Sequence, residues 1–474
     1  MQPASSETIA TPIDARGLGR RGTTLLVASL AFFVILLDNS IVNLALVRLQ
    51  QALRTDLGGL QWVVDVYALV FASLLLTGGT LADKYGASRL YLLGIALFTA
   101  ASALCGLAPT LGWLLAGRTL QGIGGALLLP ASLTLLRTAY PGTRERAHAV
   151  GIWIGAGGLA NAIGPSLGGL VITFFSWRAI FLINLPIGLT LIWLTQTRVP
   201  RVHGNQGLHL DWVGQSLVVV ALGAATWSII EGPNLGWHSP LVLCAMVLAG
   251  AGAAGFVLAE TRSAQPMLPF SLFRGNAALS IAFIGALHNV GIYGQLFVAG
   301  LFLQRILAQS PLAAGLMLLP MTASIAICAF LSGRWISRAG PFIPMNVGHT
   351  LAAAGALGMV GAAIFWQAAP PALTVVCLTA VGMGAGLASP PMTAALLTAL
   401  PQDRSGLAGG VLNMSRQVGN VLGIAVLGAV ITGFGGLSSP AGFPIAWLLA
   451  ALALGTNVVL GVAVARHPSG VQGR

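Results

Sequence analysis

Long apolar stretches alternate with short polar segments along the whole chain. A run of roughly 17 to 25 mostly apolar residues is long enough to cross a bilayer as a helix. The pattern predicts fourteen such spans, at residues 24–47, 60–82, 90–107, 112–136, 148–174, 178–195, 212–230, 240–259, 276–303, 312–333, 344–365, 372–398, 407–432 and 444–465. We therefore expect an all-α polytopic membrane protein with short loops.

The composition excludes a water-soluble protein. Hydrophobic residues make up 56% of the chain and charged residues 7%, whereas roughly 25% of a soluble chain is charged. The 62 Gly and 24 Pro suit helices in lipid, which tolerate both and use Gly for close packing. The four cysteines fall in predicted spans without a CxxC-like spacing, so we expect no metal site, no disulfide and no cofactor.

The net charge of +12 is explained by topology rather than by nucleic-acid binding. If the N-terminus is cytoplasmic, nearly all basic residues fall in segments on the cytoplasmic side. The exceptions are Arg48, Arg54, Arg178 and Arg305 on the outer side, and Arg118 and Arg416 within spans. The positive-inside rule then predicts that both termini are cytoplasmic.

The chain divides into two halves around a polar linker, Arg198–Asp211. GTLADKYG at Gly79–Gly86 and GRWISRAG at Gly333–Gly340 share a frame of two glycines with six residues between them, and both follow a span on the cytoplasmic side. Such a repeat is typical of carriers built from two parallel six-helix halves. The predicted units are a tail at 1–23, a six-helix bundle at 24–195, a linker with two extra helices at 196–275, a second six-helix bundle at 276–465 and a tail at 466–474.

Several motifs occur in a fixed order along the chain. They are LDNSIVNLAL (Leu37–Leu46), WVVDVY (Trp62–Tyr67), GTLADKYG (Gly79–Gly86), RTLQGIGGA (Arg118–Ala126), GLANAIGPSLGG (Gly158–Gly169), WRAIFLINLPIG (Trp177–Gly188) and RQVGNVLG (Arg416–Gly423). Together they resemble the major facilitator superfamily, and within it the fourteen-span drug:proton antiporters. The chain departs from the family pattern at Val47, where the family has Pro, and at Ala87 and Ser88, where it has a basic pair.

Two acidic residues, Asp38 and Asp65, lie well inside predicted spans. A charged side chain at the bilayer centre costs about 2.5–3.5 kcal/mol on insertion scales, so a functional role is the first hypothesis for both. Burial and a neighbouring carboxylate both disfavour the charged form, and either acid could exchange a proton near neutral pH. We expect them in one outward-leaning cavity; the alternative is a structural carboxylate. The resemblance implies that both match the acids of exporters that handle lipophilic cations.

Arg118 is a permanent charge inside the fourth span and needs a partner or a wet cavity. It could pair with Asp38 or with backbone carbonyls and change partner when Asp38 is protonated, and Gln121, three residues on, could share the network. The resemblance ties this Arg to proton relay. The alternative is a static structural pair.

Two glycine-rich segments are predicted to control movement. In the turn after the second span, Asp83 is expected to bind a helix N-terminus or a cytoplasmic Arg and so hold the cytoplasmic side closed; the alternative is an ordinary solvated loop acid. Gly79 and Gly86 would let the turn close tightly, and Arg89 would supply positive charge. In the fifth span, Gly158, Gly164, Pro165, Gly168 and Gly169 predict a packing hinge. The resemblance implies that this second pattern is typical of exporters; generic helix packing is the alternative.

Further polar and aromatic residues within spans are candidates to line a substrate cavity, although any single one could be structural. The predicted set is Asn43, Trp62, Tyr67, Gln121, Trp153, His288, Asn289, Gln295, Asn413, Arg416 and Gln417.

These features predict a secondary transporter rather than an enzyme. GPSLG at Gly164–Gly168 matches the GxSxG nucleophile motif, but in an apolar helix it lacks the required strand and turn. A GxxxxGK phosphate loop is excluded because Lys84 is the only Lys and follows Asp83. We expect a monomeric proton antiporter in the bacterial inner membrane. It would export a lipophilic, cationic or amphipathic compound that competes with a proton for Asp38. The alternatives are an exporter of a self-made antibiotic or siderophore, an importer or facilitator, and a receptor or membrane enzyme.

Overall fold

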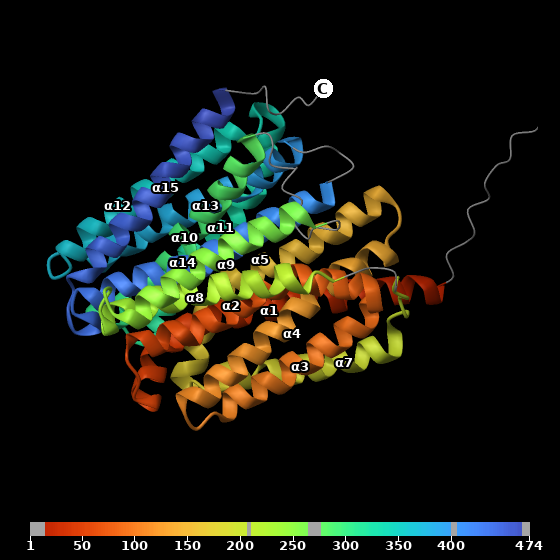
Figure 1. Cartoon of the computed structure of the whole chain (residues 1–474), viewed down its shortest axis with the longest axis horizontal. Helices are drawn as coiled ribbons and strands as arrows, with labels where there is room; N and C mark the ends of the chain where they lie inside the picture. The colour runs from red at the N-terminus through yellow and green to blue at the C-terminus, as the bar shows by residue number, and fades with distance from the viewer. Residues whose placement is uncertain (1–14, 206–209, 264–275, 400–404, 467–474) are drawn as a thin grey trace, which may run out of the picture.

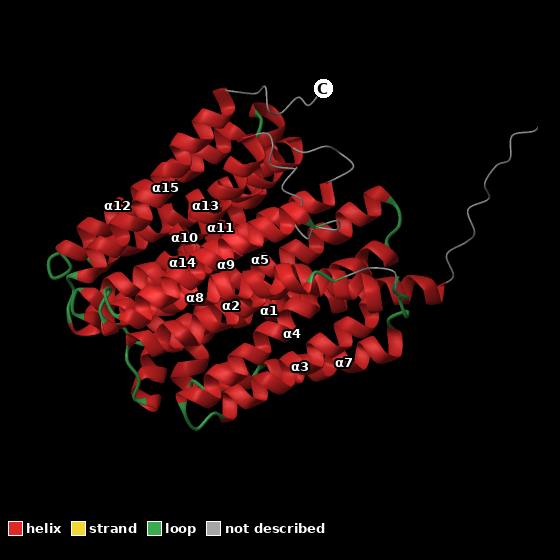
Figure 2. Ribbon diagram, in the orientation of Figure 1, coloured by secondary structure: helices red, strands yellow, loops and turns green. Residues whose placement is uncertain are grey.

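The computed structural model describes residues 15–205, 210–263, 276–399 and 405–466, and within these ranges it is helical with no strand (Figure 2). Fourteen spans in the described residues are long and apolar enough to cross a membrane, which confirms the predicted fold class. The helices are α1 (Ala15–Leu53), α2 (Leu57–Tyr85), α3 (Ala87–Leu107), α4 (Leu111–Ala139), α5 (Thr143–Phe174), α6 (Ala179–Leu182), α7 (Asn184–Arg198), α8 (Trp212–Leu235), α9 (Pro240–Arg262), α10 (Asn276–Leu301), α11 (Pro311–Ala339), α12 (Phe342–Ile364), α13 (Pro371–Ala399), α14 (Ser405–Gly433) and α15 (Gly442–Arg466).

The sixth span differs from the continuous helix that its hydropathy predicts. It is divided into the short α6 and the longer α7, with Ile183 between them. Pro186 lies in the first turn of α7, where a residue without an N–H is tolerated because that hydrogen bond is missing anyway. The break places Asn184 at the start of α7, in the interior of the protein, where it is 1% exposed.

Two bundles make up most of the protein, with a helical hairpin beside their interface (Figure 1). In the first bundle α1 packs on α5, α4 on α2 and α3, and α7 on α3; in the second α10 packs on α14, and α13 on α11 and α12. In the α8–α9 hairpin, α8 packs against α2 and α14, one helix from each bundle, and α9 packs against α8. The bundles meet through α5 and α11 on one side and through α2 and α14 on the other.

The bundles are joined at the distal end, which is the end opposite the start of α1 and the end of α15 (Figure 1). There the Ser166 hydroxyl donates to the carbonyl oxygen of Gly315 (3.0 Å), and the Gln304 amide donates to that of Leu44 (3.2 Å). In the other half of α5, Gly151 has no atom within 4 Å of the place a Cβ would take, and the same holds for Gly155 and Gly158, whereas Gly157 packs against Phe32 of α1. The structure is therefore closed at the distal end, while these three glycines of α5 lie beside open space.

Candidate functional site

Asp38 is the centre of a fully buried polar network inside the first bundle. It is 0% exposed on α1 and forms an ion pair with Arg118 of α4, also 0% exposed. Its other oxygen, Oδ1, accepts hydrogen bonds from the amides of Gln121 (3.0 Å) and Asn184 (2.9 Å). Both amides also donate to the hydroxyl oxygen of Ser102, at 2.8 and 3.3 Å. One carboxylate therefore connects helices α1, α4 and α7 and, through Ser102, α3.

Arg118 makes both kinds of contact that the sequence suggested for it. Besides the ion pair, its Nε donates to the carbonyl oxygen of Val63 (3.0 Å), and its guanidinium lies 4.3 Å from the centre of the Tyr67 ring. Its Nη2 has no hydrogen-bond partner among the described residues. Removing one partner of a buried ion pair costs about 3–5 kcal/mol, so the charge on Asp38 strongly affects how α1 and α4 are held together.

Asp65 lies on α2, away from this network. It is 0% exposed, and neither carboxylate oxygen has a hydrogen-bond partner among the described residues. One turn earlier, Gln61 donates to the carbonyl oxygens of Ile424 (3.3 Å) and Ala425 (3.0 Å) on α14, so Asp65 is on the side of α2 that faces the second bundle. A buried carboxylate without a partner is far less costly when it holds a proton.

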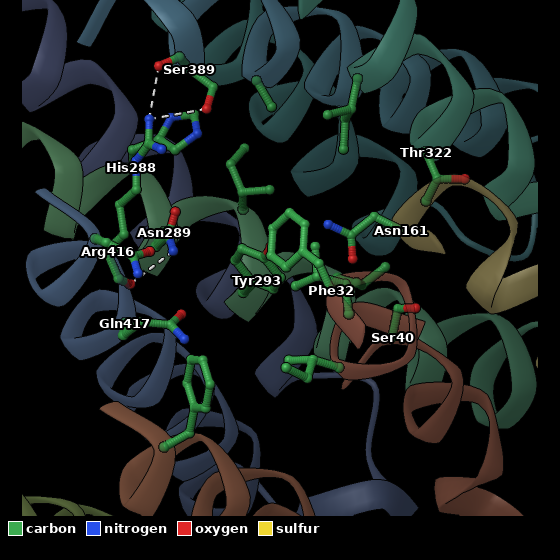
Figure 3. A pocket seen from close by; sticks show the side chains of 18 of the residues that line it. Phe32, Ser40, Asn161, His288, Asn289, Tyr293, Thr322, Ser389, Arg416 and Gln417 are labelled. Carbon is green, nitrogen blue, oxygen red and sulfur yellow. Dashed lines mark hydrogen bonds between the residues drawn. The ribbon is translucent and has the colours of Figure 1, made fainter. Parts of the chain in front are cut away.

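A cavity of about 250 Å³ lies between the bundles (Figure 3). The first bundle contributes mainly apolar side chains, including Phe32, Ile35, Leu36, Phe71 and Leu129. The second bundle contributes most of the polar ones. These are His288, Asn289 and Tyr293 of α10, Thr322 of α11, Ser389 of α13, and Asn413, Arg416 and Gln417 of α14.

Five predicted cavity residues line this cavity: His288, Asn289, Asn413, Arg416 and Gln417. Neither Asp38 nor Asp65 does. The structure therefore does not bring the two acids together in one cavity as expected. Asp38 lies on α1, whose residues Ile35, Leu36 and Ser40 line the cavity.

The other predicted cavity residues lie elsewhere. Trp153 stacks behind Phe32 (ring centres 4.0 Å apart), and Trp62 donates to Glu231 of α8 (3.1 Å). Asn43 donates to the carbonyl oxygen of Asn39 (3.2 Å). Gln121 belongs to the Asp38 network. Gln295 is 0% exposed, and its amide has no partner among the described residues.

Tyr67 lies between the network and the cavity. One side of its ring faces Arg118, and the residue also lines a void of about 30 Å³ that shares Ile35, Leu36 and Tyr293 with the cavity. Such a void has room for one water molecule. This void therefore lies between the cavity and Tyr67, which contacts Arg118 of the Asp38 network.

Sequence reasoning missed several residues of both sites. Ser102 and Asn184 complete the network, while Asn161, Tyr293, Thr322 and Ser389 line the cavity. A signal existed for Asn161 and Asn184, because each is an amide within a quoted motif. Single Ser, Thr and Tyr residues in apolar spans give no comparable signal, since they often bond only to their own helix.

In the predicted gate, only Gly86 lies in the turn between α2 and α3, with φ of 96°. Gly79 is inside α2, which continues to Tyr85, so its expected role in closing the turn is wrong. Asp83 and Arg89 are exposed. The linker folds back onto this turn: the Ser88 hydroxyl donates to the carbonyl oxygen of Pro200 (2.8 Å).

The glycines of α5 face two different helices. A Cβ at Gly164 would meet Ser40 of α1, one at Gly168 would meet Ile41 of α1, and one at Gly169 would lie 2.4 Å from the carbonyl oxygen of Pro311 at the start of α11. Pro165 lies within α5. Gly158 has open space around it. The distal half of α5 therefore joins α1 of its own bundle to α11 of the other.

Comparison with known proteins identifies the family. The model of the Major Facilitator Superfamily matches residues 28–424. The chain belongs to this superfamily. It is 38% identical over 409 residues to the multidrug resistance protein Stp of Mycobacterium tuberculosis, covering 86% of this chain and 75% of the relative. It is 36% identical over 431 residues to the methylenomycin A resistance protein of Streptomyces coelicolor, covering 91% and 90%.

Two further comparisons are consistent with a major facilitator transporter in a bacterial membrane. The tetracenomycin C resistance and export protein of Streptomyces glaucescens is 35% identical over 426 residues, covering 88% of this chain and 77% of the relative. The peptide transporter POT in complex with sulfate has a TM-score of 0.69 at 18% identity, covering 94% of this chain and 95% of that one. At that identity the likeness shows the fold alone.

Proposed function

We propose that this protein is a proton-coupled exporter of lipophilic, amphipathic drugs or antibiotics, acting as a monomer in the bacterial cytoplasmic membrane. The observation that carries the proposal is the buried Asp38–Arg118 pair on α1 and α4, because α1 also lines the cavity between the bundles. One helix thus belongs to both a candidate proton site and a candidate substrate site. The resistance and export names of the relatives support the direction of transport.

The basic residues favour cytoplasmic termini by the positive-inside rule. The distal end then faces outward, and this conformation is closed to the outside. A compound would reach the cavity from the cytoplasm or the inner leaflet. The exposed Asp83 is consistent with a cytoplasmic gate that closes only in the opposite conformation.

Coupling through α1 fits this geometry better than direct competition for one carboxylate. Asp38 is 0% exposed and does not line the cavity, so bound cargo would not touch it. Protonation of Asp38 would neutralise the partner of Arg118 and weaken the connection between α1 and α4. Because Ile35, Leu36 and Ser40 form part of the cavity wall, a shift of α1 would change the fit of the cargo.

The cost of breaking the Asp38–Arg118 pair is similar in size to the driving force for proton entry. An unpaired Arg118 costs about 3–5 kcal/mol, whereas the membrane potential supplies about 2.3 kcal/mol per charge per 100 mV. A proton gradient adds to that driving force. Asp65, a buried acid on the face of α2 towards the second bundle, is the second proposed proton site.

An exporter dedicated to one antibiotic is the second candidate. Two relatives are named for resistance to a single compound, methylenomycin A or tetracenomycin C. A panel of compounds tested in proteoliposomes with an imposed pH difference would separate the two. Transport of one scaffold alone favours the dedicated exporter, and transport of several unrelated scaffolds favours the multidrug exporter.

The test is gradient-driven efflux by the wild type and by Asp38→Asn. We expect a protonophore to abolish efflux by the wild type, and Asp38→Asn to lose efflux even with an intact gradient. Asp56→Asn is the matched control, because Asp56 is exposed and caps the start of α2 through its side chain, a role that Asn also fills. Full gradient-driven efflux by Asp38→Asn would refute the proposal.

A further inference from the structure

The central cavity contains a permanent positive charge and, among the described residues that line it, no acidic side chain. The positive charge is Arg416 of α14, which is half-buried. An arginine within a membrane span normally has a counter-charge or marks a substrate pathway. The charge balance of the cavity is therefore opposite to that expected for the binding of a cation.

Arg416 has no acidic partner in the described part of the protein, where the ion pairs are Arg118–Asp38 and Arg21–Glu145. One end of its guanidinium is fixed, because Nη2 donates to the carbonyl oxygen (2.8 Å) and the hydroxyl oxygen (3.0 Å) of Ser389. Its Nε is buried without a hydrogen-bond partner among the described residues. A guanidinium that is fixed at one end, has an unpaired N–H and lacks a counter-charge is suited to bind an anion.

The groups around Arg416 hold it in place without neutralising it. Asn289 donates to the backbone carbonyl oxygen of Arg416 (2.8 Å), which fixes α14 against α10. His288 lies 3.2 Å from His349, from Nδ1 to Nε2, and Asn457 approaches the same Nε2 at 3.4 Å. Hydrogen bonding between two imidazoles requires one nitrogen to be an unprotonated acceptor, so this His pair is neutral or carries one positive charge. Neither state supplies a negative charge.

We propose that the cavity binds the acidic head of a lipophilic compound, such as a carboxylate or sulfonate, at Arg416. This inference rests on the proposed export function and specifies its substrate class. The apolar part of the compound would lie against the apolar side chains of the first bundle, Phe32, Ile35, Leu36, Phe71 and Leu129. Figure 3 shows Phe32 on the other side of the pocket from Arg416 and Gln417, beside Asn161. A permanent cation in the same place would be repelled by Arg416. Of the two compound types expected from the sequence, the amphipathic one is therefore favoured over the cationic one.

The test compares two fluorescent probes that share one skeleton: anilinonaphthalene sulfonate, an anion, and N-phenylnaphthylamine, its neutral parent. Each is titrated against the full-length protein in a non-ionic detergent, and tetraphenylphosphonium, a lipophilic cation, is tested as a competitor. We expect the anion to bind the wild type more tightly than the neutral parent, and the cation to compete poorly. Arg416→Gln should weaken binding of the anion on the order of tenfold or more and leave the neutral probe nearly unchanged.

Two further variants make the result specific. Arg416→Lys keeps the charge and should retain most of the preference for the anion, while Arg334→Gln removes an exposed arginine and should change nothing. The inference is overturned if the wild type prefers the cation, if it binds the anion no better than the neutral probe, or if Arg416→Gln leaves the preference intact. If Arg416→Gln does not fold, the inference is judged by whether the wild type prefers the anion to the neutral probe and whether Arg416→Lys retains that preference. Gradient-driven efflux that persists when the anion fails to bind would leave the proposed function standing and remove only this inference.

Discussion

Neutralising both members of the Asp38–Arg118 pair should separate its role in stability from its role in transport. Asp38→Asn removes the counter-charge of Arg118, which is 0% exposed. It also turns an amide N–H₂ towards a site where the surrounding contacts are donors, from Arg118, Gln121 and Asn184. The loss of one partner of a buried ion pair predicts destabilisation by about 3–5 kcal/mol.

Arg118→Gln is expected to be similarly destabilising, because it leaves Asp38 charged and buried with two amide donors. The double variant Asp38→Asn/Arg118→Gln has no buried charge at this site, so it should be more stable than the sum of the single changes predicts. Coupling between residues in direct contact reaches about 3 kcal/mol. Transport should not recover with stability, because the double variant has no group at position 38 that can bind and release a proton.

The assay measures thermal unfolding of the four proteins in detergent, followed by gradient-driven efflux in proteoliposomes. Both single variants should unfold at lower temperature than the wild type, and the double variant should lie between them and the wild type. If the stability losses of the two single variants simply add up in the double variant, Asp38 and Arg118 do not stabilise the protein through their mutual contact. Efflux by the double variant at the wild-type rate would refute the assignment of the proton site to Asp38.

Three other changes follow from the packing. Asp65→Asn should leave the unfolding temperature nearly unchanged, because neither carboxylate oxygen has a described partner to lose; a large drop would reveal a contact that the structure lacks. Gly169→Ala places a Cβ 2.4 Å from a carbonyl oxygen of α11 and should open the distal end. Maleimide labelling of a cysteine introduced at that end should then increase. Gly158→Ala, which has open space around it, should leave the labelling unchanged. Gly86→Ala should destabilise the protein by about 1–3 kcal/mol, because φ is 96° and the new Cβ would lie 2.3 Å from a linker carbonyl oxygen. Wild-type unfolding of that variant would contradict the docking of the linker.

The spans could be predicted from the sequence because their lengths and hydropathy reflect the thickness of the bilayer. The break in the sixth span was not predicted, because Asn184 is the single polar residue in an otherwise apolar stretch on both sides of Ile183. The contact between Asp38 and Arg118 was anticipated because two opposite charges inside spans of one bundle have few other partners. Ser102 and Asn184 are uncharged, and their part in the network depends on how α3 and α7 are rotated.

The cavity was harder to predict because lipid and neighbouring helices are both apolar environments, so the sequence shows little of which way a side chain points. Tyr67 and Trp153 are chemically suited to bind a substrate, yet the structure places them against Arg118 and Phe32. The cationic expectation came from the two acids within spans and from the resemblance to exporters of lipophilic cations. In the structure both acids lie outside the cavity, while Arg416 lies inside it.

The proposal that Asp38 exchanges the coupled proton is tested by counting the protons released when a ligand binds. The probe that binds the wild type most tightly is added to purified protein in weakly buffered detergent, and released protons are followed with a pH indicator. If cargo favours the state in which Asp38 has lost its proton, binding releases protons and affinity rises with pH. We predict proton release by the wild type and clearly less by Asp38→Asn at saturating probe. Equal release by both proteins would show that another group exchanges the proton.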